Sequence, residues 1–311
     1  MENNSQTNDQ YDDEIDLREL FGVLWGNKIK IIGITAVFAV VSVIYALLIP
    51  NQYKASALLA PAQQQSGGLS GALGQLGGLA SLAGVSIGGG DSSESQVAQE
   101  IMKSWSFIEG FIAVNDLAVE VYAAEGWSRE SNQLKFDNDV YEVKTKTWLV
   151  ENDNIGQLGP PTSWQLFEKF SEMLAVSEDK KSGLISVSIE YYSPQIAKQW
   201  LDLYISSINK HMQARQVVKV SNNIEYLEAQ IEKTSITEMQ EVFYTIIEEQ
   251  IKSQMLAEAS PDYAFVAVSP SMVPEEKSQP KRALICILGT LLGGILSVLT
   301  VLVLRFARKP V

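Results

Sequence analysis

The chain has 311 residues, with 24 Lys and Arg against 37 Asp and Glu, and a formal charge of −13 at pH 7. This negative charge argues against a nucleic-acid partner, which requires clustered Lys and Arg to replace the counterions of phosphate. The chain contains one histidine, His211, and one cysteine, Cys286. That composition leaves no His cluster for a metal and no pair of cysteines for a disulfide or a zinc site. We therefore expect no cofactor and no catalytic or metal-binding residues.

Two apolar runs lie near the two ends of the chain. Residues 31–49 and 283–304 contain no charged side chain. As helices they would be roughly 28 and 33 Å long, enough to cross the hydrocarbon core of a membrane. The 30 residues before the first run carry seven acidic and three basic groups, unlike the short basic start of a cleaved signal peptide. The first run is therefore predicted to be a retained membrane anchor.

The basic residues beside the two runs predict the topology. Lys28 and Lys30 precede the first run, and Arg305 and Arg308 follow the second, so the positive-inside rule places both termini in the cytoplasm. The expected division is a cytoplasmic tail at 1–28, a span at 29–49, a periplasmic domain at 50–282, a span at 283–304 and a cytoplasmic tail at 305–311.

The segments around the first span differ in character. Residues 17–25 have the pattern of a short interfacial helix, with a simple solvated lead-in as the alternative. Residues 52–59 could form a strand close to the membrane. Residues 67–90 are rich in Gly, which predicts a mobile loop, with docking on a neighbouring subunit as the alternative.

The central region alternates helical and strand patterns. Residues 94–125 have apolar positions at helical spacing, and 134–150 fit either strands or an amphipathic helix. A helix is expected at 164–174 and strands at 184–191 and 263–268. The three strands at 52–59, 184–191 and 263–268 would form a small sheet close to the membrane.

Residues 194–257 form the longest helical segment, beginning after Ser193 with a proline at the first helical position. Its apolar seam consists of Val217, Val220, Ile224, Leu227 and Ile231, which we expect to mediate helix packing or oligomer contacts. The periodicity breaks at 234–237, where two capping boxes are possible, Ser235 with Glu238 or Thr237 with Gln240. A turn there would give a hairpin, which we favour, and a hinge would give one rod near 90 Å long.

Several stretches together resemble one family. They are residues 13–20 with Leu24-Trp25, residues 52–55, and the approach to the second span. That approach contains Pro270, Pro274, Ser278, Pro280 and Lys281, followed by Gly289 and Gly293. The layout resembles the polysaccharide co-polymerases, and specifically the Wzz-type chain-length determinants of Gram-negative bacteria. Gln279 interrupts the Ser-Pro-Lys of the family pattern.

The resemblance implies an α+β fold, in which two terminal transmembrane helices flank a periplasmic domain. That domain would have a small membrane-proximal α/β base and a long protruding helical segment. It further implies a non-catalytic, homo-oligomeric ring in the inner membrane, in contact with membrane lipids. The ring would set the modal length of lipopolysaccharide O-antigen made on a lipid carrier by a Wzy-type polymerase. The absence of a P-loop indicates the kinase-less class. The alternative is a co-polymerase for exopolysaccharide or capsule that works with a separately encoded kinase.

Other features have simpler interpretations. The small-xxx-small motif of Gly289 and Gly293 predicts close helix packing within one subunit or between subunits. Trp105 and Trp200 are predicted to lie in the core, and Trp127 is the tryptophan we expect to be exposed for sugar stacking. His211 is predicted to be exposed. A membrane-anchored glycan enzyme would need convergent acids that the spacing does not provide, because adjacent carboxylates such as Glu275 and Glu276 diverge on a helix.

Overall fold

The computed structural model describes residues 22, 24–62, 90–152 and 156–306. The chain divides into two compact units, residues 1–49 with 279–311, and residues 50–278. The predicted Gly-rich loop lies outside the described residues except for Gly90. Most of the predicted interfacial helix and of the C-terminal tail lies outside them too.

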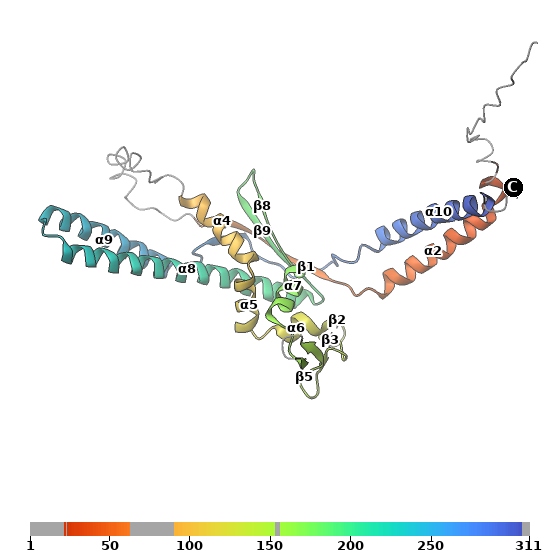
Figure 1. Ribbon diagram of the computed structural model, residues 1–311, viewed down its shortest axis with the longest axis horizontal. Coiled ribbons are helices and arrows are strands. Elements are labelled where there is room, and N and C mark those ends of the chain that lie inside the picture. The colour runs from red at the N-terminus through yellow and green to blue at the C-terminus, as the bar shows by residue number, and fades with distance from the viewer. Residues whose placement is uncertain (1–21, 23, 63–89, 153–155, 307–311) are drawn as a thin grey trace, which may run out of the picture. The chain divides into compact units, whose positions relative to one another are not determined.

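The first unit is a pair of apolar helices, α2 (Lys28–Leu48) and α10 (Arg282–Phe306), which pack along each other (Figure 1). Both are long and apolar enough to cross a membrane, with mean hydropathies of 2.6 and 2.5 in their most apolar windows. Their apolar side chains are largely exposed, as in Leu47 and Leu291. Such an outward apolar surface fits a lipid environment better than water.

The second unit contains a four-stranded antiparallel sheet in the order β10-β1-β9-β8. Its strands are β1 (Tyr53–Pro61), β8 (Leu174–Asp179), β9 (Leu184–Tyr191) and β10 (Phe265–Ser269). The three predicted strands are confirmed, and β1 lies between the other two. The fourth, β8, follows a helix directly and was not predicted.

Four short helices surround the core beside the sheet. They are α4 (Gly90–Lys103), α5 (Trp105–Val114), α6 (Ala118–Ala123) and α7 (Ser163–Met173). The helical pattern predicted over 94–125 is confirmed up to Ala123, but as separate helices, because the chain breaks at Ser104 and again at Asn115–Leu117. Ser104 caps α5 by accepting a hydrogen bond from Phe107 N, and Asp116 has a positive φ of 54°.

An insertion between α6 and α7 consists of three two-stranded sheets. Their strands are β2 (Ala124–Ser128) with β3 (Gln133–Phe136), β4 (Tyr141–Glu142) with β5 (Thr147–Trp148), and β6 (Val150–Asn152) with β7 (Gln157–Gly159). Of the two interpretations of 134–150, short strands are therefore correct.

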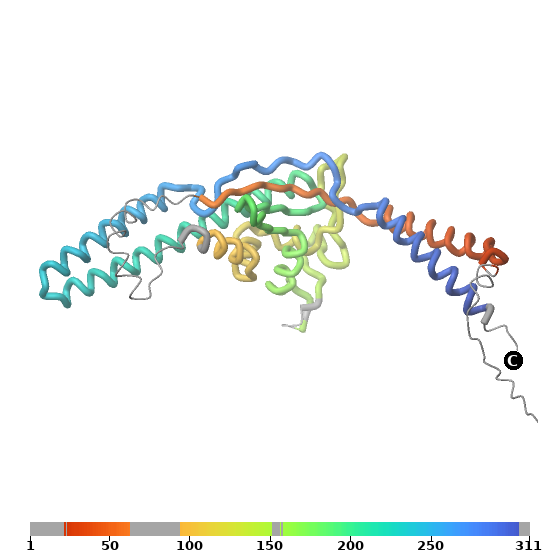
Figure 2. The backbone as a smooth tube through the Cα atoms, turned by 90° about the horizontal axis from the view of Figure 1, so that it is seen from above, coloured from red at the N-terminus to blue at the C-terminus, as the bar shows by residue number. Residues whose placement is uncertain are grey.

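The long helical segment is a hairpin of α8 (Pro194–Lys233) and α9 (Thr237–Ala259), as predicted. Figures 1 and 2 both show the two helices side by side. Ser193 caps α8 by accepting from Ile196 N at 3.5 Å. Neither predicted capping box forms at α9, which begins after Ile236 without a side-chain cap. Gln240 Nε2 instead donates to Thr234 O at 2.7 Å and closes the turn.

Candidate membrane-approach segment and packing surfaces

Two serine–carboxylate hydrogen bonds hold the segment 270–278 on the domain. Ser271 Oγ donates to Asp202 on α8, and Ser278 Oγ donates to Glu190 on β9. Ser278 N also donates to Gln52 O at 2.9 Å. Hydrogen bonds to ionised groups are about twice as strong as neutral ones. The segment is therefore fixed at both ends although it has no regular secondary structure.

The prolines predicted in this approach to the second span differ in their exposure to solvent. Pro270 is exposed, Pro274 is half-buried and Pro280 is buried. Lys281 O accepts from Leu284 N at 2.9 Å and from Ile285 N at 3.2 Å, so Lys281 stands at the start of α10.

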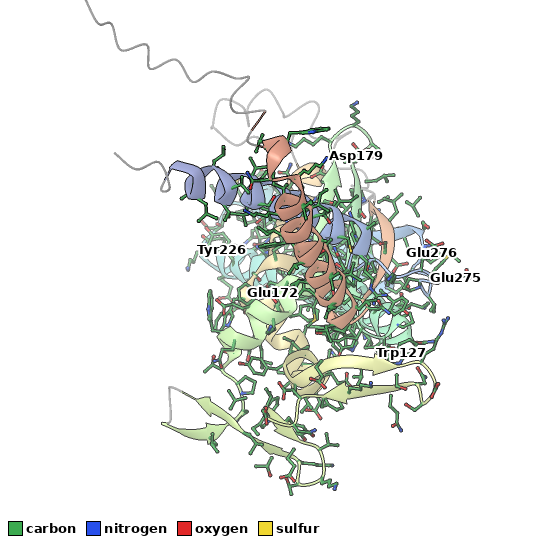
Figure 3. All side chains as sticks on the ribbon, turned by 90° about the vertical axis from the view of Figure 1, so that its right-hand side faces the viewer. Trp127, Glu172, Asp179, Tyr226, Glu275 and Glu276 are labelled. Carbon is green, nitrogen blue, oxygen red and sulfur yellow. The ribbon has the colours of Figure 1, made fainter. Side chains whose placement is uncertain are left out.

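Glu275 and Glu276 lie between the two serine anchors. Both are exposed, and their side chains project from the edge of the molecule (Figure 3). This exposure agrees with their interpretation as solvated acids.

Gly289 and Gly293 lie against α2. A Cβ added at Gly289 would be 2.5 Å from Ser42 Cβ, and one added at Gly293 would be 2.4 Å from Phe38 Cβ. Real Cβ atoms essentially never approach this closely. Gly294, by contrast, has open space where a Cβ would be. The structure thus brings the two glycines of the motif, and not their neighbour, into the contact between the two helices of one chain.

Polar groups add to the same helix contact. Thr35 Oγ1 and Ser297 Oγ are 3.3 Å apart, and Ser297 is fully buried. Arg282 Nε donates to Ala46 O at 3.1 Å, close to the end of α2. In lipid such bonds matter because no water is present to satisfy the groups otherwise.

The predicted seam of α8 faces α9. Val220 is buried at 1% exposure, and Val217, Ile224, Leu227 and Ile231 are half-buried. On α9 the facing positions include Ile247, which is buried, and Phe243, which is half-buried. The structure therefore uses the seam within the hairpin, so contacts between copies would have to use other faces.

Asn209 joins α8 to the chain that returns from α9, a role the sequence did not reveal. Its side-chain oxygen accepts from Ala264 N at 3.0 Å and from Phe265 N at 2.8 Å. Its amide nitrogen donates to Phe265 O at 2.9 Å. Asn209 is 1% exposed, so these bonds satisfy backbone groups that water does not reach. A polar residue on an otherwise apolar helical face was the signal available in the sequence.

The burial of the tryptophans differs in part from the prediction. Trp200 is in the core at 2% exposure, as predicted, but Trp105 is 45% exposed, so its core assignment is wrong. Trp105 is the first residue of α5, just after Ser104 breaks the expected helix, and this changes the face it presents. Trp127 is half-buried rather than exposed. It packs edge-on against Tyr53 at 5.9 Å and donates to Asn132 Oδ1 at 3.1 Å.

Two carboxyl groups have perturbed pKa values. Partial burial raises the pKa of Glu120, and the negative charge of Asp116 raises it further. The backbone N–H of Lys181 and the hydroxyl of Ser182 hold the pKa of Asp179 below its usual value. Burial also raises the pKa of Tyr191, whose hydroxyl donates to Glu120 O at 2.6 Å. Glu120 is half-buried on α6, Asp179 is the last residue of β8, and Tyr191 is buried in the core.

Among the described residues, no group of three His, Cys, Asp or Glu side chains could hold a metal ion. A shallow hollow of about 480 Å³ lies on α4 and is mainly apolar; it is lined by Gln96, Val97, Glu100, Ile101 and Ser104. His211 is exposed, as predicted, and its ring lies edge-on to Phe107 at 5.4 Å.

Residues 13–114 match the family model described as "Wzz: Chain length determinant protein". This first third of the chain is similar to the Wzz chain-length determinants. The match includes the first apolar helix, β1 and all of α4 and α5, and it covers both N-terminal stretches on which the resemblance rests.

Individual relatives are distant. The chain is 23% identical to the tyrosine-protein kinase etk of Escherichia coli over 274 residues, which span 71% of this chain and 36% of that protein. The chain therefore spans about a third of the length of this relative. A full-length bacterial polysaccharide co-polymerase is 14% identical at a TM-score of 0.38, with 95% of this chain and all of that one covered. A fragment of WzzB from Salmonella Typhimurium is 12% identical at 0.27, with 74% and 100% covered.

Proposed function

We propose that this protein is a non-catalytic regulator of polysaccharide chain length in the bacterial inner membrane. It sets the modal length of lipopolysaccharide O-antigen made on a lipid carrier by a Wzy-type polymerase. The observation that carries the proposal is the Wzz match on a chain whose two apolar helices bracket a domain with a long helical hairpin. Both termini lie in the cytoplasm and the domain 50–278 lies in the periplasm, in accordance with the basic residues beside the spans.

The hairpin supplies surfaces for assembly into a ring. On α9, the exposed side chains of Val242, Ile246 and Leu256 share one side. At about 100° per residue, the exposed side chains of Tyr244, Ile251 and Met255 lie about 200° away on the other side. We call these two sets the flanks of α9. Two different apolar flanks favour head-to-tail contacts between copies, and such contacts close into a ring when the rotation permits.

A second candidate function is co-polymerase activity for an exported exopolysaccharide or capsule, with a separately encoded kinase. The similarity to a tyrosine-protein kinase over 71% of this chain favours this alternative. Both functions assign the same role to the hairpin and differ in the glycan. The chemistry of the glycan therefore has to be determined in cells.

The test is a gel of lipopolysaccharide from a deletion strain and from strains complemented with the wild type and with flank variants. O-antigen control predicts that the modal length is lost in the deletion strain and returns on complementation. An unchanged ladder, together with altered exported polysaccharide, would instead establish the second candidate. If neither glycan changes, the proposal is wrong.

Ile246→Glu and Ile251→Glu place a charge in each flank of α9 and are expected to shift the modal length and reduce the oligomer size. The matched control is Thr245→Glu, because Thr245 is exposed between the flanks on the side of α9 away from α8. Equal effects of all three variants would count against the flanks as subunit contacts.

A further inference from the structure

The outer face of α8, defined here by His211, Arg215, Lys219, Asn222 and Tyr226, carries a row of cationic and aromatic side chains. His211, Arg215 and Lys219 are spaced by four residues, so at 1.5 Å per residue they recur about every 6 Å along the helix. All five residues are exposed, and Tyr226 is 65% exposed. They lie on the side of α8 opposite to Val220, Ile224 and Leu227, which pack toward α9.

The cations of this outer face have no carboxylate partner within the described ranges. The ion pairs found there join Lys103 to Glu100, Lys169 to Glu172, and Lys198 to Asp202. Arg215 and Lys219 take part in none of them. In a chain with a net charge of −13, this row is a locally positive part of the surface. It therefore attracts an anion that the rest of the surface repels.

We propose that the outer face of α8 binds the growing glycan, and that this glycan is an acidic polysaccharide bearing carboxylates. This inference rests on the proposed function and adds the chemical class of its substrate. The spacing of Arg215 and Lys219 is comparable to the length of one sugar unit in an extended chain, so successive carboxylates reach successive cations. Arg215 forms bidentate bonds to a carboxylate, and Lys219 acts as a point charge. The Tyr226 ring offers an apolar surface to the C–H face of a sugar and a hydroxyl at its edge.

The composition of the face favours a glycan over a second copy of the chain. The apolar flanks on α9 are the surfaces suited to a second copy, whereas the outer face of α8 is mainly polar and includes one exposed large apolar side chain, Val218. On α8 itself, Asp202 precedes Arg215 by 13 residues, and Glu225, Glu228 and Glu232 follow it by at least ten, about 15 Å along the helix.

The experiment measures binding of two defined probes to the full-length protein in detergent. The probes are an oligogalacturonate, which carries one carboxylate per sugar, and a dextran oligomer of the same length, which carries none. The wild type is expected to bind the acidic probe in a salt-sensitive manner and to leave the neutral one unbound. Arg215→Gln with Lys219→Gln should weaken binding of the acidic probe by about 10-fold or more. Tyr226→Ala should weaken it without changing the salt dependence.

The control is Lys233→Gln with Lys252→Gln, which removes the same charge from the hairpin outside the outer face and should leave binding unchanged. Equal weakening in both double variants, or no binding by the wild type, would overturn the inference. So would a loss of oligomer size in the Arg215/Lys219 variant, since the face would then be a contact between copies. These outcomes are separate from the glycan gel, because chain-length control without acidic-probe binding would leave the proposed function intact.

Discussion

Ser278 donates its hydroxyl hydrogen to the carboxylate of Glu190 and so joins the approach to the second membrane helix to the central part of the sheet. Glu190 on β9 lies opposite Lys54 on β1. The chain leaves the first predicted membrane span at Pro50, four residues before Lys54. The same serine also bonds to Gln52 O through both its N–H and its hydroxyl. The chain segments on either side of the domain are thus held together by one residue of the Ser-Gln-Pro-Lys sequence.

Removing this hydroxyl should loosen that junction. We expect Ser278→Ala to lower the free energy of unfolding by about 1 to 2 kcal/mol, because Glu190 loses its hydroxyl donor in a half-buried site, while Gln52 O keeps the Ser278 N–H. A double-mutant cycle with Glu190→Gln, followed by thermal unfolding of the full-length protein in detergent, measures the coupling. Ser177→Ala, at an exposed serine on β8, is the control and should have no effect. Additive effects of the two substitutions would show that the bond contributes nothing.

The glycines of the second membrane helix provide a matched comparison. Gly293→Ala is expected to destabilise the helix pair by about 1 to 3 kcal/mol, because its Cβ would lie 2.4 Å from Phe38 Cβ and the helices would have to separate. Gly289→Ala should behave similarly against Ser42. Gly294→Ala has open space and should be neutral or slightly stabilising. Thermal unfolding in one detergent ranks the three variants, and a ranking with Gly294→Ala lowest would contradict this packing.

The hairpin allows a comparison of two valines two residues apart. Val220 is 1% exposed in the seam, whereas Val218 is 60% exposed. We expect Val220→Ala to cost about 2 kcal/mol through lost burial and a residual cavity, and Val218→Ala to be nearly neutral. Urea unfolding of the detergent-solubilised protein, monitored by circular dichroism, measures both. A comparable loss in the two variants would mean that the seam is not the contact between α8 and α9.

Asn209 should be among the most sensitive polar positions in the described structure. Replacing it by Leu leaves the N–H groups of Ala264 and Phe265 without an acceptor and Phe265 O without a donor. The expected loss is about 3 to 5 kcal/mol, since each buried unsatisfied group costs about 1 to 3 kcal/mol. Asn223→Leu, at an exposed position of the same helix, is the control. Thermal unfolding of both variants gives the comparison, and similar midpoints would refute the role of Asn209.

Long periodic patterns were predicted from the sequence more successfully than short contacts. The spans, the three strands and the hairpin have patterns that depend only on the chain itself, as in the alternating run Leu184–Tyr191. The break at Ser104 was missed because its hydroxyl caps α5 within an unbroken apolar periodicity. The strand β8 was missed because it continues directly from α7 at Leu174 without a turn residue.

The roles of individual residues were less predictable because they depend on which elements meet. Asn209 and Glu190 acquire theirs from β10 and from Ser278, both distant in sequence. The Gly289–Gly293 pattern predicted close helix packing, but only the structure identifies Ser42 and Phe38 as its partners. The seam of α8 is buried or half-buried in the structure, and the sequence left open whether it would contact another helix or another copy.

The raised pKa of Glu120 makes the stability of the fold depend on pH. Because burial and Asp116 raise its pKa in the folded state, the folded protein binds this proton more readily than the unfolded chain does. The ionised carboxylate therefore destabilises the fold above its folded-state pKa, and this cost disappears as the pH falls to the ordinary pKa of a glutamate. Glu120→Gln is expected to raise the unfolding temperature at pH 7 and to have no effect near pH 4. The bond from the Tyr191 hydroxyl is retained, because it uses the backbone oxygen. Glu130→Gln, at an exposed site in the turn between β2 and β3, should change neither midpoint, and a benefit of Glu120→Gln that persists unchanged at pH 4 would exclude titration of Glu120 as the cause.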